Sequence, residues 1–247
     1  MIRASIVAVL VTLTPAALAQ TELSPTQVAG LRAEQAAPRK PITIDPASID
    51  RFVGAYQLFP STIWWITRDG SHFLARFTGG TTVEYFPESA TKFFSTEGPA
   101  QLSFESDTDG HVTAMIRHHL GIERRAPRIS AAAAMAIEDA LAVRIKDNKP
   151  APGTEAALRH QIDAMENGAF DTSVMSPELR SLINSRTPMA TTFFAQLGAF
   201  KSLTFKNVGP TGVDFYTAVF ERGRIVWSIL PLVDGKIVEL YYQRAAD

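Results

Sequence analysis

One stretch of the sequence carries a serine and a lysine at a spacing that can do chemistry. Ser89-Ala90-Thr91-Lys92 matches the pattern Ser-x-x-Lys, in which a lysine one helical turn after a serine activates that serine as a nucleophile. The chemistry needs the serine at the start of a helix. Here the four residues stand between two expected strands, and no Lys-Thr-Gly segment follows them. We therefore expect a turn in which Ser89 hydrogen-bonds the nearby backbone.

Histidine is the second residue type that could carry chemistry, as a metal ligand or as a base. The adjacent pair His118 and His119 invites a metal site, but neighbouring side chains on a strand point to opposite faces and cannot both bind one ion without a bulge. We expect one of the two inside a barrel, the other in solvent, and no metal. His160 lies three residues before Asp163 on an expected helix, where a solvated polar face is a simpler interpretation than an acid–base pair.

Aromatic side chains on the last strands of the chain form the third set. Tyr216, Trp227 and Tyr241 could line an apolar pocket on the concave face of a curved sheet, or they could fill the core beneath helices. Asp214 shares a strand face with Tyr216, so these two could act together as an acid–base and hydrogen-bonding pair. We take Tyr216, Trp227 and Tyr241 as the ligand-binding candidates, and we assign no catalytic residue, no metal ligand and no cofactor.

The region from residue 49 to residue 129 must position Ser89 to Lys92 and the pair His118 and His119, and its apolar residues recur with a period of two. Asp69-Gly70 and Gly79-Gly80 are strong hairpin signals between the runs. Roughly eight strands at this spacing predict an antiparallel barrel or sandwich. Of the adjacent Trp64 and Trp65, one should lie inside and the other outside. The expected strands cover residues 51–59, 62–68, 71–78, 81–86, 92–95, 101–106, 111–119 and 122–129.

From Ser130 onward the pattern becomes helical, and Ser130 itself suits an N-cap. Ser176-Pro177 and Thr187-Pro188 resemble two more helix starts, each with an N-cap followed by proline. Helices followed by an antiparallel meander predict an α+β module. The expected helices cover residues 131–146, 155–166, 178–184 and 189–197, and the expected strands 199–208, 213–221, 224–232 and 237–243.

The first nineteen residues have the layout of a secretory signal peptide. Arg3 supplies the positive charge, an apolar run covers Ile6 to Leu13, and Ala17-Leu18-Ala19 is a small-x-small cleavage site. We expect cleavage after Ala19 and a periplasmic or secreted protein, with a short uncleaved anchor as the alternative. Residues 20–48 contain four prolines and predict a flexible linker.

Composition narrows the functional classes further. The chain has 247 residues, of which 46% are hydrophobic, enough to bury two ordinary cores. Lys and Arg number 24 and Asp and Glu 25, with no strongly basic stretch, so we do not expect nucleic acid as a partner. Without cysteine there is no disulfide framework. We expect no membrane span after signal cleavage, and the oligomeric state stays open.

Several segments of the β-rich region carry a resemblance to a known domain: Phe52-Val53-Gly54-Ala55-Tyr56, Phe86 to Phe94, Asp109-Gly110-His111-Val112-Thr113, and His118 to Gly121 followed by Ala126-Pro127-Arg128-Ile129. Through them, residues 49–129 resemble a lipocalin-like domain of unknown function that is often appended to penicillin-binding-protein and β-lactamase-like serine hydrolases. Residues 130–247 are similar in element order and length to the NTF2-like α+β cone. Neither resemblance supplies a catalytic residue, but cones of that kind often bind an apolar ligand on the concave face of the sheet, and some perform proton transfer there.

The sequence as a whole predicts an α+β fold, with an antiparallel β-barrel-like domain over residues 49–129 and an NTF2-like cone over residues 130–247. The expected function is that of an exported, non-catalytic binding or accessory protein of the periplasm. Its partner would be a small apolar ligand, a peptide or an envelope enzyme. Two alternatives stay open: an isomerase- or dehydratase-type enzyme with Asp214 or a neighbouring carboxylate as base, and a trans-acting regulator of a serine hydrolase.

Overall fold

A computed structural model describes residues 39–98, 100–119, 122–184 and 187–245. These residues form two compact units, which divide between Leu141 and Ala142, inside helix α2 (Ala131–Asp147). Our expected boundary between residues 129 and 130 lies directly before this helix. The predicted signal peptide and the first part of the predicted linker lie outside the described residues. None of the described helices is both long enough and apolar enough to cross a membrane.

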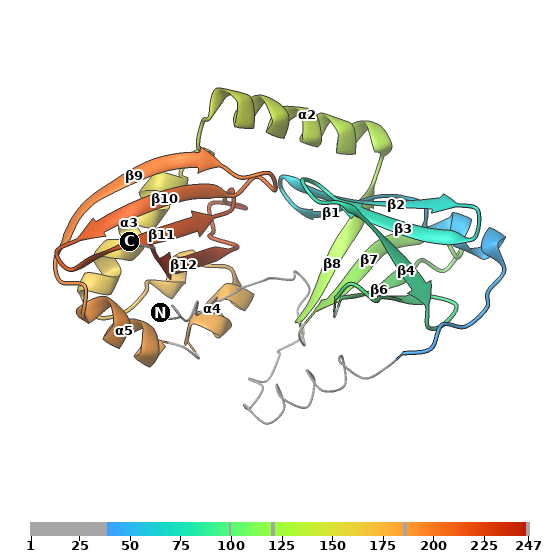
Figure 1. Ribbon diagram of the computed structural model, residues 1–247, viewed down its shortest axis with the longest axis horizontal. Helices are drawn as coiled ribbons and strands as arrows, with labels where there is room; N and C mark the ends of the chain where they lie inside the picture. Colours follow the sequence, from blue (N-terminus) through green and yellow to red (C-terminus); the bar gives the residue numbers. More distant parts are fainter. Residues whose placement is uncertain (1–38, 99, 120–121, 185–186, 246–247) are drawn as a thin grey trace, which may run out of the picture. The chain divides into compact units, whose positions relative to one another are not determined.

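Within the described residues, the first unit is a closed barrel of the eight antiparallel strands β1 to β8 (Figure 1). Each strand pairs with its neighbour in sequence, and β1 pairs with β8 to close the barrel. The structure thus confirms an antiparallel barrel with a strand at each expected position. The strands are β1 (Gly54–Phe59), β2 (Thr62–Asp69), β3 (His72–Phe77), β4 (Thr82–Pro87), β5 (Lys92–Ser95), β6 (Gln101–Ser106), β7 (Val112–His119) and β8 (Ile122–Ile129).

The approach to the barrel differs from the prediction. A short 3-10 helix, η1 (Pro46–Phe52), occupies residues that we expected in the linker and in the first strand. It begins there because the Asp45 carboxylate caps it by accepting a hydrogen bond from the backbone N–H of Ala47, with Pro46 at the first helical position. Just before η1, the backbone N–H of Ile42 donates to the carbonyl of Pro87 over 2.9 Å, so this part of the expected linker lies along the barrel.

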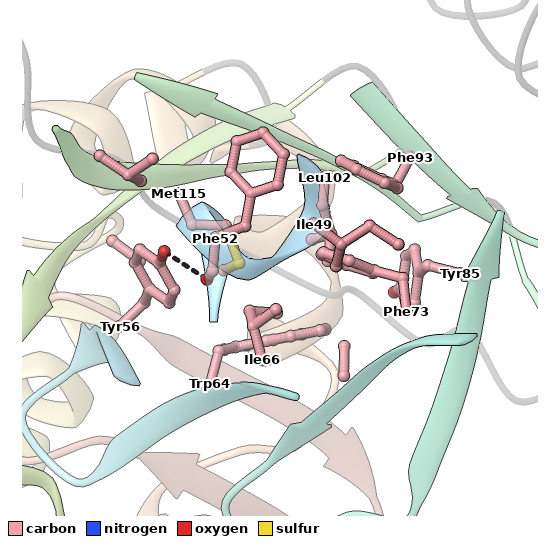
Figure 2. Close-up of a cluster of buried hydrophobic side chains, with 13 residues drawn as sticks. Ile49, Phe52, Tyr56, Trp64, Ile66, Phe73, Tyr85, Phe93, Leu102 and Met115 are labelled. Atoms are coloured by element: carbon pink, nitrogen blue, oxygen red, sulfur yellow. Dashed lines mark hydrogen bonds between the residues drawn. The ribbon is translucent and has the colours of Figure 1, made fainter. Parts of the chain in front are cut away.

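Aromatic side chains fill the interior of the barrel (Figure 2). Phe52 of η1 points inward, with its ring centroid 4.4 Å from that of Phe104 and 5.5 Å from that of Phe93. Phe73 stacks on Phe93 at 4.1 Å between centroids. The hydroxyl of Tyr56 is satisfied inside this cluster, because it donates to the carbonyl of Phe52 over 2.7 Å. A barrel of eight strands is just wide enough for side chains to fill it, and here they do.

The two adjacent tryptophans of β2 lie on opposite sides of the barrel wall, as predicted. Trp64 belongs to the interior cluster and is 7% exposed. Trp65 faces outward, where its indole N–H donates to a carboxylate oxygen of Glu138 on α2 over 3.1 Å. The expected cap of α2 is also present, since the hydroxyl of Ser130 accepts from the backbone N–H of Ala133. The first part of α2 therefore covers an outer face of the barrel.

The second unit is a four-stranded antiparallel sheet in the order β12-β11-β10-β9, with helices against one face (Figure 1). The predicted last strand starts later than expected, because Ile237 forms a parallel bridge with Met175 outside the sheet. The other predicted elements lie within two residues of their expected bounds, except that the strand expected over residues 224–232 already ends at Ile229. A short 3-10 helix over residues 172–174 was not predicted. The elements of this unit after α2 are α3 (Thr154–Glu166), η2 (Thr172–Val174), α4 (Pro177–Asn184), α5 (Thr187–Ala195), β9 (Phe200–Val208), β10 (Asp214–Phe220), β11 (Gly223–Ile229) and β12 (Leu240–Arg244).

We predict that Phe73→Ala lowers the free energy of unfolding of the barrel by roughly 3–5 kcal/mol, because it empties a packed site in the aromatic cluster. Leu74→Ala is the matched control on the outer face of the same strand and should cost about 1 kcal/mol. Hydrogen exchange of β3 and β4 peptides in increasing urea measures both values for the barrel alone. Equal losses in the two variants would contradict a filled interior.

Candidate functional site

The predicted ligand-binding residues lie on the sheet of the second unit, but not all on one face. Tyr216 and Trp227 are cross-strand partners on β10 and β11, and both are fully buried. Tyr241 pairs with Ser228, the neighbour of Trp227, so it points to the opposite face and is half-buried. Tyr242 pairs with Trp227 instead. The structure therefore brings Tyr216 and Trp227 together and puts Tyr242 where we expected Tyr241.

Aromatic rings surround Trp227 on the helix side of the sheet. Phe194 of α5 stacks on it, with centroids 5.5 Å apart and an interplanar angle of 20°. Phe170 meets the indole edge-on at 6.2 Å, and Tyr242 lies 5.2 Å away. These rings form a buried apolar cluster between the helices and the sheet.

Two buried polar atoms interrupt this apolar region. Among the described residues, neither the indole N–H of Trp227 nor the side-chain oxygen of Gln161 on α3 has a hydrogen-bond partner. Both side chains are fully buried. The amide nitrogen of Gln161 donates to the carbonyl of Asp171 over 2.9 Å, and Asp171 follows Phe170, which contacts Trp227. Gln161 and Trp227 thus both contact the segment Phe170-Asp171. Each of the two polar atoms costs about 1–3 kcal/mol if left unsatisfied.

A buried carboxylate joins the start of α3 to β10. One oxygen of Asp214 accepts from the backbone N–H of Ala151 over 2.7 Å and from the hydroxyl of Thr154 over 2.8 Å. The same hydroxyl lies 3.0 Å from that of Tyr216, so Asp214 and Tyr216 share one network, as their strand spacing predicts. The other oxygen lies 3.7 Å from a guanidinium nitrogen of Arg144.

Burial dominates the electrostatics of this network. It raises the pKa of Asp214, against the lowering effect of the hydrogen bonds from Ala151 and Thr154 and of the Arg144 charge. Burial likewise raises the pKa of Tyr216. A carboxyl of raised pKa can act as a base, but the Asp214 oxygen that accepts two hydrogen bonds is committed to holding α3.

Most of the remaining sequence candidates have structural partners. The hydroxyl of Ser89 accepts from the backbone N–H groups of Thr91 and Lys92, at 3.3 Å and 3.1 Å, which confirms the predicted turn. Nε2 of His160 lies 2.7 Å from a carboxylate oxygen of Asp171. Hydrogen bonds from Ser173 and His160 lower the pKa of Asp171 to about 2.

The other histidines divide between the turns and the outer wall of the barrel. His111 stands with Asp107 and Asp109 in a turn where the three potential ligand atoms lie within 4.8 Å of one another. All three are exposed, and Asp107 already accepts from the backbone N–H groups of Asp109 and His111, so turn chemistry accounts for the grouping. His118 hydrogen-bonds side chains of two neighbouring strands. The side chain of His119 lies outside the described residues.

Comparison with known families gives one match, to the barrel. The sequence profile of a domain of unknown function, DUF3471, matches residues 38–130, which are the barrel strands and the segment leading into them. Together with the closed eight-strand topology, this fits the lipocalin-like domain that the sequence predicts. Neither the curated proteins nor the solved structures contain a match to the chain. The likeness of the second unit to an NTF2-like cone and the association with serine hydrolases stay predictions.

We predict that Asp214→Ala lowers the free energy of unfolding by about 1–3 kcal/mol, because the N–H of Ala151 loses its acceptor and the Thr154 hydroxyl loses one of its partners. Asp214→Asn keeps one acceptor oxygen and should lose less. Urea unfolding of the second unit, followed by hydrogen exchange of α3 and β10 peptides, measures both changes. If Asp214→Ala were as stable as the wild type, the carboxylate would not hold α3.

The raised pKa of Asp214 also predicts a pH dependence of stability. The folded chain takes up a proton on Asp214 more readily than the unfolded chain, whose carboxyl has the ordinary pKa of about 3.9. This contribution to stability is present below the ordinary pKa and is lost as pH rises through the raised one. The wild type should therefore gain stability over Asp214→Asn when urea unfolding is repeated at progressively lower pH between 7 and about 4. A difference that does not change with pH would contradict this.

Proposed function

We propose that the protein is an exported binding protein whose second unit, an NTF2-like cone, holds a small and mostly apolar ligand beside Trp227. The observation that carries the proposal is the pair of buried polar atoms on Trp227 and Gln161 within aromatic surroundings. Ligand sites are mostly apolar, with a few placed polar groups that fix the orientation of the bound molecule. The secretory layout of residues 1–19 supports export.

The two polar atoms define the chemistry of this ligand. The Trp227 indole can only donate a hydrogen bond, so the ligand must offer an acceptor there. The Gln161 oxygen can only accept, so the ligand must also offer a donor. Phe170 and Phe194 favour a flat, apolar body. An aromatic or polycyclic molecule with one hydroxyl or amide group meets all of these requirements.

The filled barrel supports the choice of the second unit. In a lipocalin-like domain the interior is the natural place for a small ligand, but here Phe52, Phe73 and Phe93 are packed inside it and each is at most 1% exposed. A ligand entering there would have to displace a stacked aromatic cluster. Trp227 is equally buried, but unlike these phenylalanines it carries a polar atom that has no partner among the described residues and that a ligand would satisfy.

An enzyme with Asp214 as base is the second candidate, supported by the raised pKa of that carboxyl. It is the weaker one, because proton abstraction would have to use a group that holds Ala151 and Thr154 in place. Asp214→Asn separates the two functions. It should leave ligand binding nearly intact in a binding protein, and it would abolish turnover in an enzyme.

Two measurements on the full chain test the binding function. Native mass spectrometry of protein purified from periplasm should show a retained small molecule. For affinity, 1-anilinonaphthalene-8-sulfonate is a suitable probe, since it combines a flat apolar body with a donor and an acceptor. We predict that Trp227→Phe, which keeps an aromatic ring and removes the N–H, raises the dissociation constant of this probe about fivefold, as the loss of one hydrogen bond worth ~1 kcal/mol.

Trp64→Phe is the matched control for that prediction. It makes the same chemical change in the core of the barrel and should leave the affinity for the probe unchanged. Equal affinities in the two variants, together with a clean apo mass for the wild type, would contradict a ligand site beside Trp227 and identify the aromatic cluster there as core alone.

A further inference from the structure

Four polar side chains form a row across the outer wall of the barrel, one from each of four neighbouring strands. Lys92 on β5 and Ser103 on β6 are register partners. His118 on β7 and Glu123 on β8 are register partners as well. Leu102, next to Ser103, is fully buried in the barrel core, so Ser103 faces outward. We call these four residues the Lys92–Glu123 row.

Hydrogen bonds connect three members of this row in sequence. The hydroxyl oxygen of Ser103 lies 2.7 Å from Nε2 of His118, and Nδ1 of His118 lies 3.1 Å from a carboxylate oxygen of Glu123. A carboxylate can only accept, so Nδ1 carries the proton and Nε2 has the lone pair that accepts from the Ser103 hydroxyl. A serine, a histidine base and an orienting carboxylate in this order form the arrangement that activates a serine nucleophile.

The surroundings keep His118 in the state that a base needs. Burial lowers its pKa, Lys92 acts in the same direction, and the charge and hydrogen bond of Glu123 oppose them. The histidine is therefore neutral at neutral pH and can take a proton from Ser103. Its side chain is 20% exposed, which leaves an approach from solvent.

Lys92 supplies positive charge beside the serine. Its side chain stands next to Ser103 on the neighbouring strand and is 40% exposed. Ser103 lies within the sheet between β5 and β7, where backbone groups are used in strand pairing. The ammonium of Lys92 lies 3.9 Å from a carboxylate oxygen of Glu88 and would have to turn from it to stabilise a developing oxyanion. One cation of this kind favours esters with a good leaving group over amides.

We propose that the Lys92–Glu123 row is a hydrolytic site for carboxylic esters, with Ser103 as nucleophile, His118 as general base and acid, and Glu123 as the positioning residue of His118. This activity goes beyond the binding function proposed for the second unit and does not depend on it.

The reaction proceeds in two steps. The Ser103 oxygen attacks the ester carbonyl carbon while its proton passes to Nε2 of His118. The tetrahedral adduct collapses, the bond to the alcohol oxygen breaks, and the departing alcohol takes that proton. Water then attacks the acyl-serine with His118 as base. The carboxylic acid leaves, and the proton returns to Ser103.

A fluorophosphonate probe, which reacts covalently with activated serines, tests the proposal on the full chain. We predict that tryptic mass spectrometry finds the adduct on Ser103 and that Ser103→Ala loses it. His118→Gln should slow the labelling about 100-fold, as expected for the removal of a general base. Glu123→Gln should slow it less, and Glu123→Asp, which keeps a carboxylate, should restore part of the rate. Ser106→Ala is the matched control on the same strand and should label like the wild type.

Two results would overturn the assignment. One is a wild-type chain without an adduct on Ser103. The other is a His118→Gln variant labelled within tenfold of the wild-type rate, because Ser103 would then react without its base. Trp227→Phe lies in the other unit and should leave labelling unchanged, so failure of this proposal and failure of the binding proposal can be told apart.

Discussion

Closing eight strands into a barrel forces each strand residue to face either an interior just wide enough for side chains or an outer wall. In this protein the rings of Phe52, Phe73 and Phe93 fill the interior, so packing stabilises the barrel, and the polar side chains of the Lys92–Glu123 row lie on the outer wall. The same alternation that turns Leu102 inward turns Ser103 outward beside Lys92. The aromatic core and the polar row are thus two consequences of one constraint.

In the second unit, side chains also alternate between the two faces of each strand, but the sheet is open. Helices must therefore cover its apolar face. Asp214 fixes one of those helices to the sheet by accepting from Ala151 and Thr154. A buried carboxylate is tolerated there because these bonds offset the cost of removing it from water. The indole N–H of Trp227 and the side-chain oxygen of Gln161 have no hydrogen-bond partner among the described residues, so they are the groups that a ligand beside Trp227 would satisfy.

The sequence predicts the strands well because their signals are local: a period of two, with Asp-Gly and Gly-Gly turns between the runs. The prediction from sequence fails where a contact between distant residues determines the local structure or the face on which a side chain lies. The apolar pattern around Phe52 continues that of β1, so the last two residues of η1, Arg51 and Phe52, were predicted as part of a strand. Tyr241 and Tyr242 are equally aromatic, and only the pairing of Tyr242 with Trp227 shows which one faces the helices. Likewise, nothing in the sequence links Ser103 to His118 or His118 to Glu123, because strand register brings them together.

Access to water decides what each of the two sites can do. In the Lys92–Glu123 row the Lys92 and Glu123 side chains are 40% and 63% exposed, so solvent screens their charges and only a weak electrostatic gain is available to a transition state. This weak stabilisation limits the substrates of the Lys92–Glu123 row to esters with a good leaving group, such as an alcohol of low pKa. Around Trp227 water is excluded, each hydrogen bond counts for more, and an uncompensated polar atom is costly. We therefore expect ligand binding beside Trp227, since hydrogen bonds are stronger at a site without water. We expect hydrolysis at Ser103, since water can reach the acyl-serine at an exposed site.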